Sequence, residues 1–246
     1  MCGRFALLTE PSNIYKLFKV EPPDEGIEFS ANFNVAPTTQ IPIAITSQHG
    51  PRLISARWGL IPHWAKDPKI SYKLINARSE SVFEKPSFRG VISKRRCLIP
   101  TDGFYEWLKE GRGKSATKRP HFIHHKDHSP LVMAGLWTTW KNDEGEVVPS
   151  FSILTCEPNP LVAKIHGRMP VILPPSDFEQ WIDPELSRDG IESMLRPYPQ
   201  GSMDTYEVSS YVGSVHNKGP KCMAPIPSDA PALARTPEPV ADVQQA

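Results

Sequence analysis

Proline occupies 27 of the 246 positions, about 11% against roughly 5% in average proteins, and its spread along the chain limits which folds are open to it. The proline ring clashes with a helix interior and removes a hydrogen-bond donor that a central strand needs. Long helices and coiled coils are therefore not expected. The hydrophobic share of 39% and the charged share of 22% still predict a folded chain with a sizeable core. Since no apolar run approaches the ~20 residues of a membrane span, we expect no membrane association.

Short apolar runs of strand length recur between Gly, Pro and Asp residues. The predicted strands are 3–8, 41–45, 53–58, 97–99, 104–108, 122–124, 131–140, 151–155 and 171–173. The predicted helices are short: one that begins at Pro11, then 79–89, 160–165, 176–181 and 190–195. Residues 33–37 are interpreted as a turn. Because strands and helices do not alternate regularly, we expect an α+β fold: a single domain whose mainly antiparallel sheet forms a barrel-like core with a few short peripheral helices.

Residues 1–223 contain no strong linker and no internal repeat, so we expect one domain there. Residues 224–246 change to a proline-rich composition with Ala, Asp and Gln, which predicts a disordered tail. The four cysteines, at positions 2, 97, 156 and 222, show no CxxC spacing and are too few for a disulfide scaffold. We therefore expect the cytoplasm as the compartment, with nucleoid association when the protein is bound to DNA.

Positive charge is concentrated in one part of the chain. The formal net charge is only +1, but residues 85–126 hold eleven Lys or Arg against three Asp or Glu, a local balance of +8. The rest of the chain then carries −7. A basic zone on a nearly neutral protein indicates a surface for a polyanion such as nucleic acid. A well-solvated basic face is the alternative that the charge count leaves open.

Cys2 is the first candidate for chemistry. If Met1 is removed, Cys2 carries an α-amine and a thiol on adjacent carbons. An α-amine has a pKa near ~7.7–8.0, so a useful fraction is neutral and nucleophilic at pH 7. Such an aminothiol condenses with an aldehyde to an imine, and the thiol then closes a thiazolidine ring in a favourable intramolecular step. A cysteine that merely falls second in the chain and is buried is the alternative.

Glu106 and His166 are candidates for proton transfer. In a strand, Glu106 would share a face with Phe104 and Leu108, and burial there would raise the pKa of its carboxyl group. His166 is predicted in a loop, and its imidazole titrates near neutrality. A solvated glutamate on an edge strand and a helix-terminal histidine that binds backbone carbonyls are the alternatives.

Further polar and aromatic residues suit a nucleic-acid ligand. Asn76 and Arg78 share a face if their segment is extended, and together they offer an amide and a guanidinium to a sugar-phosphate backbone. Trp58 lies in a strand pattern and is predicted in the core, whereas Trp64 follows a proline and is the better candidate for stacking on a base. The histidine group His121, His124, His125 and His128 fits no zinc motif, so a strand with a polar turn is preferred and no metal site is predicted.

Six motifs occur together and in order along residues 1–222. They are Met1-Cys2-Gly3-Arg4-Phe5, Phe33-Asn34-Val35-Ala36-Pro37, Trp58-Gly59-Leu60-Ile61-Pro62, Ile75-Asn76-Ala77-Arg78, Asp102-Gly103-Phe104-Tyr105-Glu106-Trp107, and Ile165-His166 with Arg168 and Pro170. In this combination the chain resembles the SRAP family, the SOS response-associated peptidases or abasic-site processing proteins.

The resemblance implies an activity and a set of roles. It implies a DNA damage response enzyme that binds single-stranded DNA and forms a covalent thiazolidine cross-link between the N-terminal cysteine and an abasic-site aldehyde. A thiol autopeptidase activity and lyase-type chemistry are also implied, with no cofactor. The implied catalytic residues are Cys2, Asn76, Glu106 and His166. The implied DNA contacts are Arg4, Arg78 and Arg168 to phosphates, and Pro37 and Trp64 against the flanking bases.

One position departs from the family pattern, because Ala65 stands where some members carry a second tryptophan, which puts stacking strength in doubt. We expect a monomer whose partner is abasic single-stranded DNA. Two other classes of function stay open: a cysteine peptidase that acts on proteins through Cys2 and His166, and a nucleic-acid-binding module without catalysis.

Overall fold

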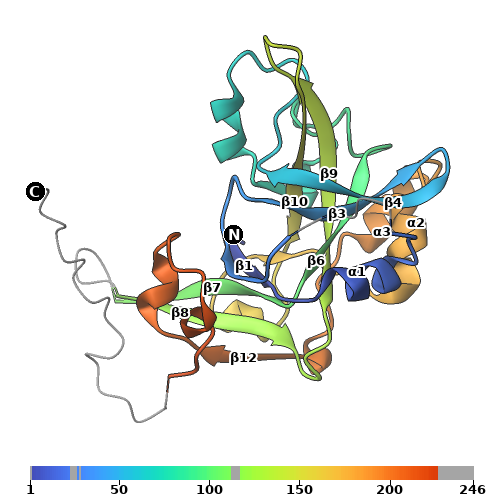
Figure 1. The fold of residues 1–246 in the computed structure, drawn as a ribbon. Coiled ribbons are helices and arrows are strands. Elements are labelled where there is room, and N and C mark those ends of the chain that lie inside the picture. The colour runs from blue at the N-terminus through green and yellow to red at the C-terminus, as the bar shows by residue number, and fades with distance from the viewer. Residues whose placement is uncertain (1, 23–26, 28, 112–116, 227–246) are drawn as a thin grey trace, which may run out of the picture.

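Twelve strands, almost all antiparallel, make up most of the fold in a computed structural model that describes residues 2–22, 27, 29–111 and 117–226 (Figure 1). The strands are β1 Arg4–Leu7, β2 Asn32–Val35, β3 Gln40–Ser47, β4 Gly50–Trp58, β5 Asn76–Arg78, β6 Arg96–Thr101, β7 Gly103–Glu110, β8 Thr117–His125, β9 Leu131–Lys141, β10 Val147–Cys156, β11 Met169–Pro170 and β12 Met203–Glu207. Their pairings divide them into two sheets.

Five strands of the larger sheet close into a barrel. β10 pairs with β4, β4 with β3, β3 with β6, β6 with β9, and β9 again with β10. Only β10 makes parallel pairs among the described strands, with β4 and with β5. The wall is tight at Gly135 of β9, where a Cβ would lie 2.5 Å from Ile99 Cδ1 and 2.8 Å from Cys97 Sγ. The expected α+β fold, a single domain with a barrel-like core, is confirmed.

The second sheet has the strand order β12-β8-β7-β1-β2. In it, β1 from the start of the chain pairs with β7 from the middle of the chain. Side chains alternate along β7: Phe104 belongs to the main core and Leu108 packs against it, whereas Tyr105 and Trp107 belong to a smaller cluster on the other face. This alternation is the period-two pattern predicted for residues 104–108. It directs Glu106, which lies between Phe104 and Leu108, to the same face as those two residues.

The helices are short and lie outside the barrel, as expected from the abundance of proline. α1 is Pro11–Phe18, α2 is Phe178–Ile182 and α3 is Arg188–Met194, and the three lie together on one side of the molecule in Figure 1. The rings of Phe18 in α1 and Phe178 in α2 are in contact, with centroids 5.9 Å apart. The 3₁₀ segments are Pro68–Lys73, Ser79–Ser81, Val162–Lys164, Pro175–Asp177, Gln200–Ser202, Ser210–Gly213 and Pro220–Cys222.

Several predicted elements differ from the structure. Residues 79–89 form only a 3₁₀ turn, Ser79–Ser81, followed by further turns, and 160–165 holds only the 3₁₀ turn Val162–Lys164. Both segments have apolar residues at helical spacing but pack as tight turns on the barrel. The predicted turn at 33–37 is largely strand β2, because Val35 pairs with Phe5. The predicted strand 171–173 holds only an isolated bridge at Ile172, directly after the two-residue strand β11. Strand β12 was not predicted.

The predicted tail, 224–246, lies outside the described residues from position 227 onward. No helix among the described residues is long and apolar enough to cross a membrane.

Candidate functional site

Cys2 lies directly before β1 and has no exposed surface. Its thiol donates a long hydrogen bond to the Arg4 carbonyl, with Sγ 3.8 Å from the oxygen. Burial, and next the nearby Glu106 carboxylate, raise the pKa of the Cys2 thiol far above its usual range. The Asn76 side chain holds the Cys2 main chain, because Asn76 Nδ2 donates a hydrogen bond to the Cys2 carbonyl at 2.8 Å. The thiol is therefore protonated, and its backbone is fixed in place.

Glu106 projects from the centre of β7 toward the same point. β1 and β7 run antiparallel with Arg4 opposite Tyr105, so the chain preceding Arg4 continues alongside Glu106. The Glu106 residue is only 3% exposed. Burial raises the pKa of its carboxyl group, and the nearby His166 opposes that shift. A carboxyl group in this environment keeps its proton to a higher pH than an ordinary glutamate, which suits it to proton transfer.

His166 faces Glu106 from the loop between the 3₁₀ segment Val162–Lys164 and β11. Its Nδ1 lies 3.9 Å from Glu106 Oε1. The Arg168 backbone N–H donates to the same Nδ1 at 3.0 Å. The Arg168 carbonyl oxygen also lies 3.2 Å from Nδ1, so the backbone of Arg168 fixes the orientation of the imidazole ring.

An open cavity of about 440 Å³ lies over these two residues. It is lined by Glu106, Trp107, Lys109, Lys118, His166 and Gly213. Its wall combines one acidic group and two lysines, so an anionic ligand carrying an electrophile could enter it. We call this the Glu106 cavity.

Asn76 and Arg78 lie on β5, as the extended spacing predicted. β5 pairs in parallel with β10, with Asn76 opposite Ile153 and Arg78 opposite Thr155. The Asn76 amide nitrogen is used by Cys2, but its buried Oδ1 accepts no hydrogen bond from a described residue. Arg78 is exposed. This segment therefore offers one buried acceptor at Asn76, next to Cys2, and one exposed guanidinium at Arg78.

The other two predicted phosphate ligands are engaged by the protein itself. Arg4 donates to Asn34 Oδ1 at 2.8 Å and to the carbonyls of Val212 and Gly213 at 2.8 and 3.0 Å. Burial lowers the pKa of the Arg4 guanidinium.

Arg168 forms a two-pronged pair with the Glu80 carboxylate, at 2.6 and 2.9 Å, and also donates to the Thr155 carbonyl. The same pair lowers the pKa of the Glu80 carboxyl group. For Arg4 and Arg168, contact with a phosphate stays a prediction.

The two tryptophans are placed as predicted. Trp58 is fully buried in the core, and Trp64 is 51% exposed. Pro37 is partly buried after β2, and Ala65 is buried, with its carbonyl accepting from Trp140 Nε1 at 2.7 Å. Trp64 does not line the Glu106 cavity.

The four histidines of the β8 region contact neighbouring residues of the protein. His121 and His124 lie within hydrogen-bond distance of backbone carbonyls, His125 contacts Asp127, and His128 stacks on His124. Within the described ranges, no group of three or more His, Cys, Asp or Glu side chains could hold a metal ion.

Two residues of this region escaped the sequence analysis, Asn34 and Glu80. Asn34 is fully buried, and its side chain bridges Arg4 to the segment 212–217. A signal existed, since Asn34 stands inside the second of the six motifs, but the motif was interpreted only as a turn. For Glu80 there was no signal, because its partner Arg168 is 88 positions away.

Known proteins with similar sequences and structures share this architecture over nearly the whole chain. Residues 1–215 match the family described as SOS response associated peptidase (SRAP). The abasic site processing protein YoqW of Bacillus subtilis is 42% identical over 222 residues, covering 90% of this chain and 98% of that protein. The abasic site processing protein HMCES of Gallus gallus is 31% identical, covering 82% of this chain and 68% of that protein.

A crystal structure of a Bacteroides thetaiotaomicron protein superposes with a TM-score of 0.81 at 30% identity, covering 92% of this chain and all of that one. Both the family match and the relatives extend over the six motifs that first indicated the resemblance. The chain therefore belongs to the SOS response associated peptidase family.

Proposed function

We propose that this protein processes abasic sites by capturing their open-ring aldehyde on Cys2 in single-stranded DNA. The observation that carries the proposal is the position of Cys2: its carbonyl is held by Asn76 at 2.8 Å, and it lies beside the buried Glu106, which together with His166 lines the Glu106 cavity. Relatives at 42% and 31% identity are named abasic site processing proteins, which supports the same substrate.

The chemistry starts with removal of Met1, which frees the α-amine of Cys2. The neutral amine adds to the aldehyde carbon and forms a carbinolamine, which loses one water to give an imine. The thiol sulfur then adds to the imine carbon, its proton passes to the nitrogen, and a thiazolidine ring results. The net change is loss of one water. Without the thiol, the imine would promote β-elimination and break the strand, so fast ring closure protects the DNA.

Glu106 and His166 supply the proton transfers in this scheme. The raised pKa of Glu106 lets its carboxyl group give a proton to the departing hydroxyl of the carbinolamine and accept one from the thiol. The imidazole of His166, which lines the Glu106 cavity, is suited to a hydrogen bond with the sugar oxygen during ring opening. The free Oδ1 of Asn76 accepts a hydrogen bond from a sugar hydroxyl or from the new amine.

Single-stranded DNA binding is assigned to five residues around the site. The exposed Arg78 is free for a phosphate, and Pro37 and Trp64 lie against flanking bases. Arg4 and Arg168 would bind phosphate either through guanidinium N–H groups that are not hydrogen-bonded within the protein, or after their present protein partners move away.

Denaturing electrophoresis tests the proposal. Purified protein, its N-terminus established by intact-mass spectrometry, is incubated with a single-stranded oligonucleotide containing one abasic site. We expect a shifted band that survives denaturation, lost in Cys2→Ala and retained in Cys222→Ala, a second buried cysteine that serves as the matched control. No shifted band, or active protein that fully retains Met1, would refute the thiazolidine mechanism.

A second candidate, favoured by the description of the family, is a thiol peptidase in which Cys2 is the nucleophile and His166 the base. The burial that raises the pKa of the Cys2 thiol disfavours a thiolate, which a peptidase needs and the imine route does not. A peptidase would cleave peptide substrates and leave the DNA aldehyde unreacted in the same gel.

A further inference from the structure

One ion pair joins the two chain segments that carry Asn76 and His166. Glu80 lies in the 3₁₀ segment Ser79–Ser81, which follows directly after β5, and Arg168 lies directly before β11. The Arg168 Nη1 and Nη2 groups donate to the two Glu80 carboxylate oxygens at 2.6 and 2.9 Å. A guanidinium and a carboxylate that meet through two parallel hydrogen bonds fix each other in angle as well as in distance. We call this pair the Glu80–Arg168 clasp.

The Arg168 end of the clasp is anchored to the barrel. Its Nη2 also donates to the Thr155 carbonyl at 2.6 Å, and the Arg168 side chain is only 16% exposed. Thr155 is fully buried on β10, where its backbone pairs with Arg78 of β5 and with Pro170 of β11. Isolated surface ion pairs contribute little, but a two-pronged pair on a largely buried guanidinium is the exception. The guanidinium is therefore held at the strand with which both segments pair.

His166 depends on the backbone of Arg168 for its orientation. The Arg168 N–H donates to His166 Nδ1 at 3.0 Å, and the Arg168 carbonyl oxygen lies 3.2 Å from the same atom. The same Nδ1 lies 3.9 Å from Glu106 Oε1. Because residue 168 contributes its side chain to the clasp and its backbone to the imidazole, a movement of Arg168 would also move His166 relative to Glu106.

The Glu80 end of the clasp is connected to Cys2. β5 comprises only Asn76–Arg78, and Glu80 follows two residues after it. Asn76, at the start of β5, donates to the Cys2 carbonyl at 2.8 Å. The clasp therefore joins the loop of His166 to the same short segment that holds the Cys2 backbone.

We propose that Glu80 is a positioning residue for the covalent step. By holding Arg168, it fixes the imidazole of His166 relative to Cys2 and Glu106. The inference rests on the proposed function for the reaction that His166 serves, whereas the clasp is a property of the free protein. The alternative is that Glu80 only withholds Arg168 from a DNA phosphate, and its removal would then strengthen DNA binding and leave the chemistry unchanged.

The first measurement is made on the free protein. Deuterium exchange of the Arg168 amide, followed by NMR, reports how often its hydrogen bond to His166 opens. Glu80→Gln keeps the size of the side chain and removes its charge, so we expect this amide to exchange roughly tenfold faster, the effect of weakening one charged hydrogen bond. Glu84→Gln, at an exposed glutamate four positions later, is the matched control and should exchange as the wild type does.

The second measurement is single-turnover cross-linking to an abasic single-stranded oligonucleotide at increasing DNA concentrations. The maximal rate reports the chemistry, and the half-saturating concentration reports binding. We expect Glu80→Gln to lower the maximal rate roughly tenfold, which is part of the effect of a general acid–base group. Glu80→Asp keeps the charge and should recover part of that rate. Glu84→Gln should match the wild type.

A double-mutant cycle shows whether Glu80 acts through His166. In the His166→Ala background no imidazole remains to be positioned, so adding Glu80→Gln should change the maximal rate by less than about twofold. An equal loss in both backgrounds would overturn the positioning role. So would a tighter affinity for DNA with an unchanged maximal rate, which is the result expected if Glu80 only competes with phosphate.

The two measurements separate failure of this inference from failure of the proposed function. A wild-type protein that forms no cross-link would refute the proposed function, and the exchange of the Arg168 amide would still decide the clasp. An amide that exchanges equally in Glu80→Gln and the wild type would overturn the clasp, whatever the cross-linking shows. If thermal unfolding shows that Glu80→Gln does not fold, Arg168→Lys takes its place, because a lysine cannot form the two-pronged pair. The same results are then expected, with exchange followed at the amide of residue 168.

Discussion

Glu106 is the residue whose environment decides most about the chemistry. Strand alternation alone placed its carboxyl group between Phe104 and Leu108 on the apolar face, and the structure confirms that it is buried, at 3% exposed. Burial raises the pKa of the carboxyl group because the charged form loses its hydration. The buried carboxyl group therefore costs fold stability at pH values where it is ionised.

That cost predicts a pH-dependent difference in stability. The folded-state pKa of Glu106 lies above its unfolded value of ~4.3, so folding favours the protonated form and loses stability as pH rises through the window between the two values. Glu106→Gln removes the charge. Its melting temperature should equal that of the wild type near pH 4 and exceed it at pH 7 to 8.

Thermal unfolding across pH 4 to 8 measures this difference. Glu144→Gln, at an exposed glutamate in the turn before β10, is the control and should follow the wild type throughout. A difference between Glu106→Gln and the wild type that does not change with pH would show that the charge of Glu106 carries no cost.

Strand β2 shows how one short element connects distant parts of the chain. Its Asn34 side chain donates to the carbonyls of Val212, Ser214 and Asn217 at 3.1, 2.9 and 2.7 Å and accepts from Arg4. The segment held in this way includes Gly213, which lines the Glu106 cavity. β2 therefore fixes one wall of the site without entering it.

Removing that side chain should loosen the wall. Asn34→Ala removes three hydrogen bonds to backbone carbonyls and one from the Arg4 guanidinium, which should lower the free energy of unfolding by about 2–4 kcal/mol. Urea denaturation measures the loss. Asn13→Ala, an exposed asparagine in α1, should change it by less than about 0.5 kcal/mol. An Asn34→Ala protein as stable as Asn13→Ala would mean that the segment 212–217 is held by other contacts.

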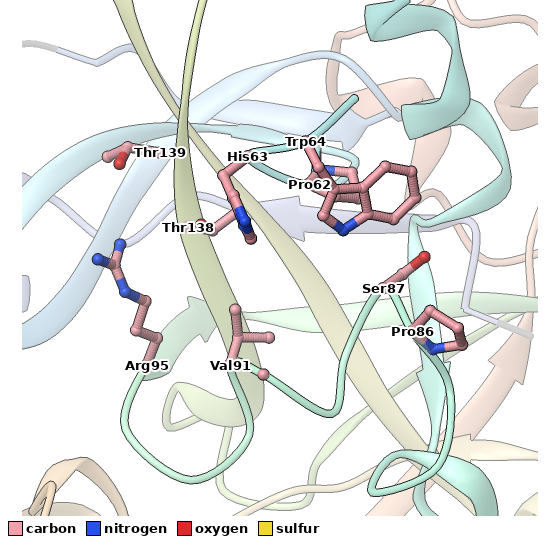
Figure 2. A pocket seen from close by; sticks show the side chains of 10 residues that line it. Pro62, His63, Trp64, Pro86, Ser87, Val91, Arg95, Thr138 and Thr139 are labelled. Carbon is pink, nitrogen blue, oxygen red and sulfur yellow. The ribbon is translucent and has the colours of Figure 1, made fainter. Parts of the chain in front are cut away.

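The distribution of charge over the molecule predicts how DNA binds. The basic zone 85–126, at +8 on a chain of net charge +1, includes the segment 86–95, which lines a cavity together with Trp64 (Figure 2), and the two lysines of the Glu106 cavity. Phosphate contacts release counterions, so affinity for undamaged single-stranded DNA should fall steeply with salt and depend little on sequence.

The exposed Arg78 gives the quantitative test. Arg78→Gln should reduce the slope of log affinity against log salt by about 0.7, the value for one phosphate on a single strand. Arg52→Gln, an exposed arginine on β4, should leave the slope unchanged. Titrations at several salt concentrations decide it. An unchanged slope for Arg78→Gln, or a strong preference for one flanking sequence, would contradict phosphate binding at Arg78.

Local patterns along the chain were enough for most strands, for the shortness of the helices and for the buried face of Glu106. These properties depend on neighbours two to four positions away, and such short-range periodicity is visible in the order of apolar and polar residues. The same local rules failed at residues 79–89 and at β2, where packing on the barrel and pairing with β1 outweighed the local preference.

Long-range pairing decided the rest. Barrel closure joins Trp58 to Phe151, and Arg168 meets Glu80 across 88 positions. The Arg4 guanidinium meets the Val212 carbonyl across 208 positions. Each of these contacts follows from how the whole core packs, because the free energy that selects one pairing is summed over many buried residues and no single segment carries it. The six motifs could thus identify the residues of the site, whereas the partners that occupy Arg4 and Arg168, and the cavity beside Trp64, emerge only when the barrel is closed.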